Sequence, residues 1–173
     1  MKLQSTADYQ LWLVLDSSLL IDIHTGLILA AFFTLPYRFI APDVIIAELY
    51  EPDGQQLLGY GLQQGELTGE QVREVLDLRN LYRRPSVNDL FALVLARHLE
   101  ATLLTSDRHL RMAATEQGVA VHGTLWVLDE LVRLAIVAPA TAADALRLMV
   151  ARGSRLPPEE CNRRLEQWSS IVP

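Results

Sequence analysis

Short apolar runs alternate with segments of helical pattern along most of this chain, and this alternation restricts the fold more than any other feature. The runs stand at residues 11–15, 38–41, 101–105 and 119–121. They are largely apolar instead of alternating between apolar and polar positions, which is typical of parallel strands buried on both faces. We also expect a short edge strand near Glu66 and Leu67. The pattern predicts an α/β protein with a mainly parallel sheet between two layers of helices.

The helices are delimited by capping residues, prolines and glycines. We expect them at residues 17–21, 27–34, 43–49, 69–83, 86–96, 109–116, 123–136, 141–151 and 159–168. With 173 residues the chain has the length of one domain. We therefore predict an α/β domain over residues 1–136, with residues 137–173 as a helical extension of the same domain.

Composition removes several classes of protein from consideration. The single cysteine, Cys161, excludes an internal disulfide and any zinc site built from several cysteines. A net charge of -6 argues against a broad basic face for nucleic acid. Residues 1–10 lack the basic start and apolar centre of a signal peptide, and no apolar run is long enough to span a bilayer. We expect a cytoplasmic protein without a membrane partner.

Four acidic residues stand where a parallel sheet would gather them. Asp16 and Asp107 each follow an apolar run, and ligands of open α/β sheets bind beyond the carboxyl ends of the strands. Glu48 lies on the helix after the second run, and Asp89 lies in the first turn of the helix that precedes the run before Asp107. If the strands before Asp16 and Asp107 are neighbours, these two carboxylates enter the same crevice, and the predicted topology allows Glu48 and Asp89 to join them at one edge of the sheet.

Clustered carboxylates require compensation. Two unit charges about 4 Å apart repel by about 4 kcal/mol at an effective dielectric constant of about 20. Bound cations or protonation relieve this repulsion. Carboxylate oxygens suit Mg²⁺ or Mn²⁺, and such ions orient water and stabilise charge on a phosphodiester. The residues alone thus favour a metal site, with Asp16, Glu48, Asp89 and Asp107 as its ligands.

The same four acids lie in motifs that resemble the PIN-domain family, in the order found in that family. The motifs are LVLDSSLLI at residues 13–21, APDVIIAEL at 41–49, SVNDLFALVLA at 86–96 and LLTSDRHLR at 103–111. The resemblance covers about residues 11–136. Members of the family include VapC-like ribonuclease toxins and uncharacterised prokaryotic PIN proteins. It implies a Rossmann-like three-layer α/β/α fold, an RNA substrate, an Mg²⁺- or Mn²⁺-dependent endoribonuclease activity and an antitoxin protein as partner. It also implies a homodimer.

Each site residue has a simpler explanation that stays open. Asp89 and Asp107 are at positions where they would cap helices, and Glu48 would suit an exposed helix face. Ser18 and Ser106 would either cap helices or hydrogen-bond the ligand carboxylates and water on the metal.

Rival folds that place an aspartate after the first strand lack their other residues here. A haloacid-dehalogenase-type phosphatase would have an aspartate at the position of Ser18, and a dinucleotide-binding domain would have a glycine-rich turn there. A response-regulator receiver would have a lysine at a late strand end, and Lys2 is the only lysine. The remaining alternative is a PIN-like module that binds nucleic acid or protein without cleaving. It is favoured by Arg108, His109 and Arg111, which occupy the stretch where family toxins often have a further acid.

Overall fold

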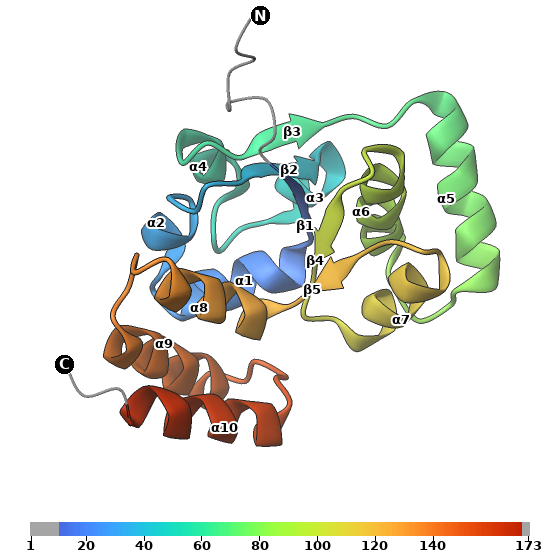
Figure 1. Ribbon diagram of the computed structural model, residues 1–173. Helices are drawn as coiled ribbons and strands as arrows, with labels where there is room; N and C mark the ends of the chain where they lie inside the picture. Colours follow the sequence, from blue (N-terminus) through green and yellow to red (C-terminus); the bar gives the residue numbers. More distant parts are fainter. Residues whose placement is uncertain (1–10, 171–173) are drawn as a thin grey trace, which may run out of the picture.

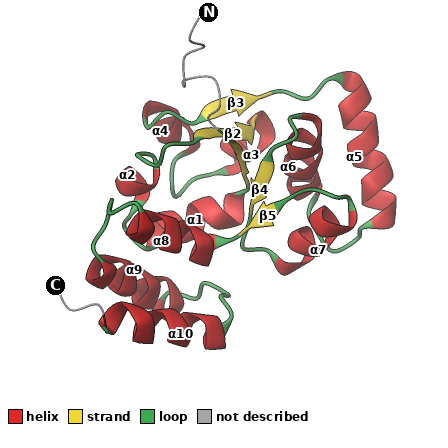
Figure 2. Cartoon of the chain, viewed as in Figure 1, coloured by secondary structure: helices red, strands yellow, loops and turns green. Residues whose placement is uncertain are grey.

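The computed structural model describes residues 11–170, which form a five-stranded parallel sheet between two layers of helices (Figures 1 and 2). The strand order is β3-β2-β1-β4-β5, so the chain runs outward from β1 in one direction and then returns to β1 to run outward in the other. The strands are β1 (Trp12–Leu15), β2 (Arg38–Pro42), β3 (Gln63–Gly65), β4 (Thr102–Leu104) and β5 (Val121–His122). The predicted three-layer α/β/α architecture is confirmed, and all the strand pairs in the described residues are parallel.

The helices cover both faces of the sheet. On one face α6 packs against β1, β2 and β4, with α5 and α7 beside it. On the other face α1 and α8 pack together, and α9 lies against both (Figure 1). The helices are α1 (Ser17–Thr25), α2 (Leu29–Phe32), α3 (Asp43–Glu48), α4 (Gly54–Gly59), α5 (Gly69–Leu81), α6 (Val87–His98), α7 (Arg108–Glu116), α8 (Thr124–Arg133), α9 (Pro139–Ala151) and α10 (Pro158–Ser169).

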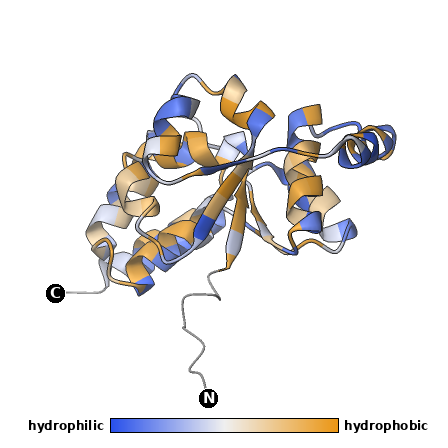
Figure 3. Cartoon of the chain, turned by 90° about the horizontal axis from the view of Figure 1, so that it is seen from above, coloured by the Kyte–Doolittle hydropathy of each residue, from blue (hydrophilic) through white to orange (hydrophobic). Residues whose placement is uncertain are grey.

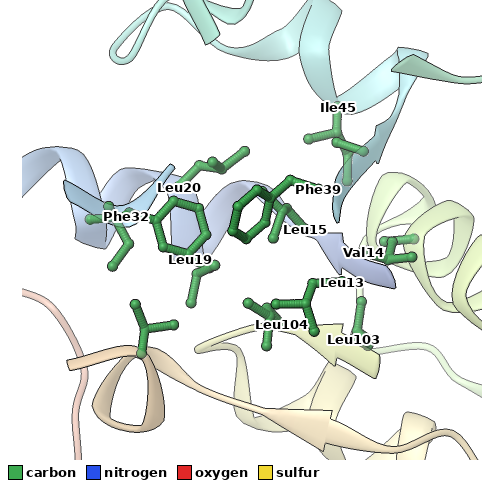
Figure 4. Packing of buried hydrophobic residues seen from close by; sticks show 14 of the residues in the cluster. Leu13, Val14, Leu15, Leu19, Leu20, Phe32, Phe39, Ile45, Leu103 and Leu104 are labelled. Atoms are coloured by element: carbon green, nitrogen blue, oxygen red, sulfur yellow. The ribbon is translucent and has the colours of Figure 1, made fainter. Parts of the chain in front are cut away.

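The central strand β1 is apolar because both of its faces are covered. Leu13, Val14 and Leu15 are each at most 1% exposed. Their neighbours in the core come from α1, β2 and β4, as Figure 4 shows. Hydropathy along the ribbon follows the same plan, with apolar residues concentrated in the central strands and the outermost helix α5 mainly hydrophilic (Figure 3). A strand that is buried on both faces holds the residue after its carboxyl end, here Asp16, in a fixed position.

The edge strands differ most from the sequence prediction. The edge strand expected near residues 66 and 67 lies instead at β3, three residues earlier, and its exposed Gln63 and Gln64 give no apolar signal. The residues after it lead into Thr68, which forms a capping box with Gln71 and starts α5. The last strand begins at Val121 instead of Val119, because the Val119 N–H closes α7 by donating to the Ala114 carbonyl (2.9 Å).

The C-terminal helices pack onto the α/β layers. Arg164 of α10 donates to Asp129 of α8 at 2.8–3.1 Å, and Trp168 is buried. Gly26 lets α9 approach α1 closely, since a Cβ at this position would overlap the Met149 side chain. The domain division at residue 136 stays a prediction, and residues 1–10, where no export signal is predicted, lie outside the described residues. Within residues 11–170, no helix combines the length and the apolar character needed to cross a membrane.

Gly54, at the start of α4, allows the close packing of α4 on α3. A Cβ there would lie 2.9 Å from the Ile46 carbonyl carbon and nearer still to its oxygen, whereas a Cβ at Gly59 would meet nothing within 4 Å. We expect Gly54→Ala to lower the free energy of unfolding by about 1–3 kcal/mol, because backbone must move. Gly59→Ala, in the same helix, should raise it by about 0.5 kcal/mol. Urea unfolding of both variants measures this, and equal effects would contradict the packing described.

Candidate metal centre

The two strand-end aspartates lie beside the point where the strand order reverses, between β1 and β4. β1 pairs with β4, with Leu15 opposite Leu104, and the Asp16 N–H donates to the Leu104 carbonyl (3.2 Å). Asp16 directly follows β1, and Asp107 comes three residues after the end of β4. In an open α/β sheet this is the edge at which ligands bind. The strands that precede Asp16 and Asp107 are therefore neighbours.

Asp16 is a fully buried carboxylate held by groups of its own chain. Its Oδ1 accepts hydrogen bonds from the Leu19 N–H (3.0 Å) and the Ser18 hydroxyl (2.8 Å), which makes it the N-cap of α1. Its Oδ2 accepts from the buried Thr105 hydroxyl (2.5 Å). The Ser18 and Thr105 hydroxyls lie 3.3 Å from each other. These contacts tie the end of β1, the start of α1 and the end of β4 into one unit.

Burial dominates the electrostatics of Asp16. Removal from water raises the pKa of its carboxyl to about 7, although the Thr105, Leu19 and Ser18 hydrogen bonds act in the opposite direction. The negative charge of Asp89 contributes to the rise. Around neutral pH the carboxyl is therefore divided between its protonated and ionised forms, and a cation in the site would favour the ionised form.

Asp89 and Glu48 are brought together where α3 ends and α6 begins. Asp89 accepts from the Ser86 N–H (2.7 Å), and its own N–H donates to the Ser86 hydroxyl (3.1 Å), which completes a capping box. Glu48 is the last residue of α3, and its Oε2 accepts from the Asn88 side-chain amide (2.6 Å). Burial raises the pKa of Asp89, and the charges of Asp107 and Glu48 raise it further.

Asp107 caps α7 through the Leu110 N–H, which donates to its Oδ1 (2.7 Å). The N–H of Asp107 in turn donates to the Thr105 hydroxyl (3.0 Å). Ser106 contributes its N–H, which donates to the Ser18 hydroxyl (3.1 Å). Within the described residues, the Ser106 side chain makes no hydrogen bond, whereas the Ser18 hydroxyl donates to the carboxylate of Asp16.

The capping roles and the proximity of the four acids therefore occur together. The charges of the four acids influence one another in pairs, through Asp89. Across residues 11–170, however, no three acidic, histidine or cysteine side chains are grouped as they would be around a metal ion. Asp89, Asp107 and Glu48 each bond a protein N–H group through one oxygen, and the other oxygen of each has no hydrogen bond within those residues. Three carboxylate oxygens are thus available near a buried fourth carboxylate.

Two residues that touch these acids were missed in the sequence. The sequence predicts Thr105 only as the last residue of a strand, and it assigns no role to Asn88, which precedes Asp89. Thr105 is 0% exposed, and a hydroxyl so deeply buried needs partners, which it finds in Asp16 and the Asp107 N–H. The detectable signal was a polar residue ending an apolar strand two positions before a site aspartate.

The comparisons with known proteins agree with the fold. A family model described as a PIN domain matches residues 12–170, which includes the two C-terminal helices. No protein of curated function is significantly similar to the chain in sequence. The matched region takes in every strand and all four acids. The chain therefore belongs to the PIN-domain family.

Proposed function

We propose that this protein is an Mg²⁺- or Mn²⁺-dependent endoribonuclease that hydrolyses RNA phosphodiester bonds at the Asp16 edge of the sheet. PIN domains are generally nucleases, and this chain has the PIN fold. The observation that carries the proposal is the buried carboxylate of Asp16, which is under the influence of Asp89, while Asp89 is itself under the influence of Asp107 and Glu48. A buried carboxylate under the influence of further negative charge is costly unless a cation or a proton neutralises it.

The residues present fit a hard divalent cation. Only oxygen donors are offered, and Asp16, Asp89, Asp107 and Glu48 would hold the ion. When bound, such an ion lowers the pKa of water and offsets charge on the phosphodiester. The protein's part is to keep the carboxylates in place. Ser18 and Thr105 orient Asp16, and Asn88 orients Glu48.

Cleavage of RNA tests the proposal directly. Purified protein should cut single-stranded RNA when Mn²⁺ or Mg²⁺ is supplied and stop when EDTA is added, because the proposed reaction uses the ion to activate water. Mn²⁺ should also raise the midpoint temperature of thermal unfolding, since it binds only the folded site. If neither effect is seen at millimolar Mn²⁺, the proposal of a metal centre is wrong.

The alternative is a PIN-like module that binds nucleic acid or protein without cleavage. The hydrogen bonds that already engage each carboxylate favour it, together with Arg108, His109 and Arg111 in place of a further acid. RNA binding without cleavage at any Mn²⁺ concentration would establish this alternative. A toxin–antitoxin role and the homodimer stay predictions. Light scattering decides the second, because a monomer mass at high concentration would contradict it.

A further inference from the structure

A cavity of about 760 Å³ lies next to the candidate metal centre. Thr105 and Ser106, which precede Asp107, form its wall on the side of the acids. The start of α7, the β5–α8 junction and the segment that leads into α10 form the rest. The C-terminal helices thus help to build a space that opens beside the proposed reaction site.

The walls of this cavity are basic in a protein of net charge -6. Four arginines line it, and one of them, Arg164, is neutralised by Asp129 and Glu160 at 2.8 and 2.9 Å. The others are Arg108, Arg111 and Arg155. Within the described residues none of these three has a carboxylate within ion-pair distance. Three unneutralised guanidinium groups around one cavity are suited to an anionic ligand.

Arg111 is fixed in position by the backbone around it. Its Nη1 donates to the Thr105 carbonyl (3.3 Å), and a Cβ on Gly123 would lie 2.8 Å from the same nitrogen. Gly123 is also the N-cap of α8 and supplies no side-chain cap, so N–H groups of the first turn of α8 lack a side-chain acceptor. Guanidinium and helix N–H donors therefore stand on the same wall, an arrangement that binds phosphate.

A pair of stacked aromatic rings also lies on the cavity wall. The His122 and Trp126 rings stack with centroids 4.4 Å apart and planes 4° from parallel, and both residues line the space. The Trp126 ring also packs against the Tyr37 ring, with centroids 5.9 Å apart. Burial and the nearby Arg111 lower the pKa of His122, which favours its neutral ring at physiological pH. A nucleobase can extend an aromatic stack of this kind, beside arginines that hold its phosphate.

We propose that this cavity binds one nucleotide of single-stranded RNA adjacent to the cleaved bond, with its phosphate on Arg108, Arg111 and Arg155 and its base against the His122–Trp126 stack. The proposal rests on RNA being the substrate of the neighbouring acids, but the binding itself needs no metal. The aromatic wall distinguishes a nucleotide from an acidic peptide, which would use the arginines alone.

Binding is tested in EDTA, by fluorescence anisotropy of a short labelled single-stranded RNA. Arg155→Ala is expected to weaken binding about 5- to 10-fold and to lower the slope of log affinity against log salt by about 0.7, the share of one phosphate contact. The matched control is Arg152→Ala, an exposed arginine at the end of α9 that does not line the cavity. It should stay near wild type. Equal affinities for the two variants would overturn the proposal.

The base is tested separately with His122→Ala and two competitors. His122→Ala should weaken RNA binding about 5-fold or more through loss of stacking, while affinity for inorganic polyphosphate is unchanged. If polyphosphate or polyglutamate displaces RNA from wild type as well as unlabelled RNA does, the nucleotide site is wrong.

Cleavage assays in Mn²⁺ separate this inference from the proposed function. Arg155→Ala should raise KM and leave kcat near wild type, because the residue is outside the acidic site. RNA binding that depends on Arg155 in a protein without cleavage would uphold the cavity and end the nuclease proposal. Metal-dependent cleavage with RNA affinity unchanged in Arg155→Ala would support the nuclease proposal and contradict the nucleotide site in the cavity.

Discussion

Replacing Asp16 by asparagine is expected to abolish RNA cleavage and, at the same time, to make the metal-free protein more stable at neutral pH. The loss of activity should be at least about 100-fold, since changes to groups that merely support a metal ligand already cost 10- to 100-fold. The gain in stability follows from burial, because asparagine keeps the shape of the side chain and carries no charge to be buried. One substitution would thus separate what the residue does for function from what it costs the fold.

The pH dependence of this gain has a definite sign. The folded pKa of Asp16 is about 7, above the usual value of 3.8. Between these values the folded protein holds a proton that the unfolded chain releases, so the contribution of Asp16 to stability is full below pH 4 and is lost as pH rises through 7. The difference of about three between the folded and unfolded pKa values corresponds to at most roughly 4 kcal/mol of unfolding free energy, since a pKa difference of one is about 1.4 kcal/mol. Because asparagine matches the hydroxyl and N–H donors less well, we expect a net gain of about 1–3 kcal/mol at pH 8.

Urea unfolding in EDTA at pH 5 and pH 8 measures this effect. Asp16→Asn should match wild type at pH 5 and exceed it at pH 8, and Mn²⁺ should stabilise wild type alone. Asp77→Asn on α5 is the control, an exposed carboxylate outside the site, and should change neither stability nor cleavage. A variant no more stable than wild type at pH 8 would show that the buried charge is compensated. Undiminished cleavage would exclude Asp16 from the reaction.

The sequence predicted the parts of the fold that have a strong apolar signal. β1 and β4 were recognised because burial on both faces makes a strand apolar throughout, and Asp16 and Asp107 were located by those strand ends. β3 was misplaced because an exposed edge strand made of Gln63 and Gln64 has no such signal. What decides a strand's composition is its surroundings, so edge strands are the hardest to place.

The candidate site was predictable as a set of acids but not as a set of contacts. Strand order brings Asp16 and Asp107 to one edge, and order along the chain suggests where the strands go. The partners of a carboxylate depend on side-chain positions that only packing determines. Thr105 and Asn88 reach Asp16 and Glu48 across 89 and 40 positions of sequence, and no local pattern encodes such a pairing. For this reason Thr105 and Asn88 emerged only from the structure, whereas Ser18, two positions from Asp16, was identified from the sequence.

Thr105 offers the second large effect, because its hydroxyl joins the two strand-end aspartates. It donates to Asp16 and accepts from the Asp107 N–H, so Thr105→Val removes the shortest hydrogen bond to the buried Asp16 Oδ2, which keeps only the Ser18 hydroxyl, and leaves an N–H without that acceptor. We expect RNA cleavage at neutral pH to fall about 10- to 100-fold. Unfolding free energy should fall by about 1–3 kcal/mol. Since the Thr105 hydrogen bond lowers the pKa of Asp16, its loss should move the rise of activity with pH to higher pH.

The shape of the pH profile distinguishes this positioning role from general damage to the sheet. Thr105→Ser retains the hydroxyl and should restore both the activity and the profile, whereas Thr105→Val should recover part of its activity as pH rises and Asp16 ionises. Thr102→Val is the matched control. Thr102, in β4, is likewise buried, at 7% exposure, and within the described residues its hydroxyl makes no hydrogen bond to a site group, so cleavage should persist. If Thr105→Val keeps the wild-type profile, or Thr105→Ser fails to restore cleavage, the hydroxyl does not govern Asp16. The reactivity of the site would then depend on the carboxylates alone.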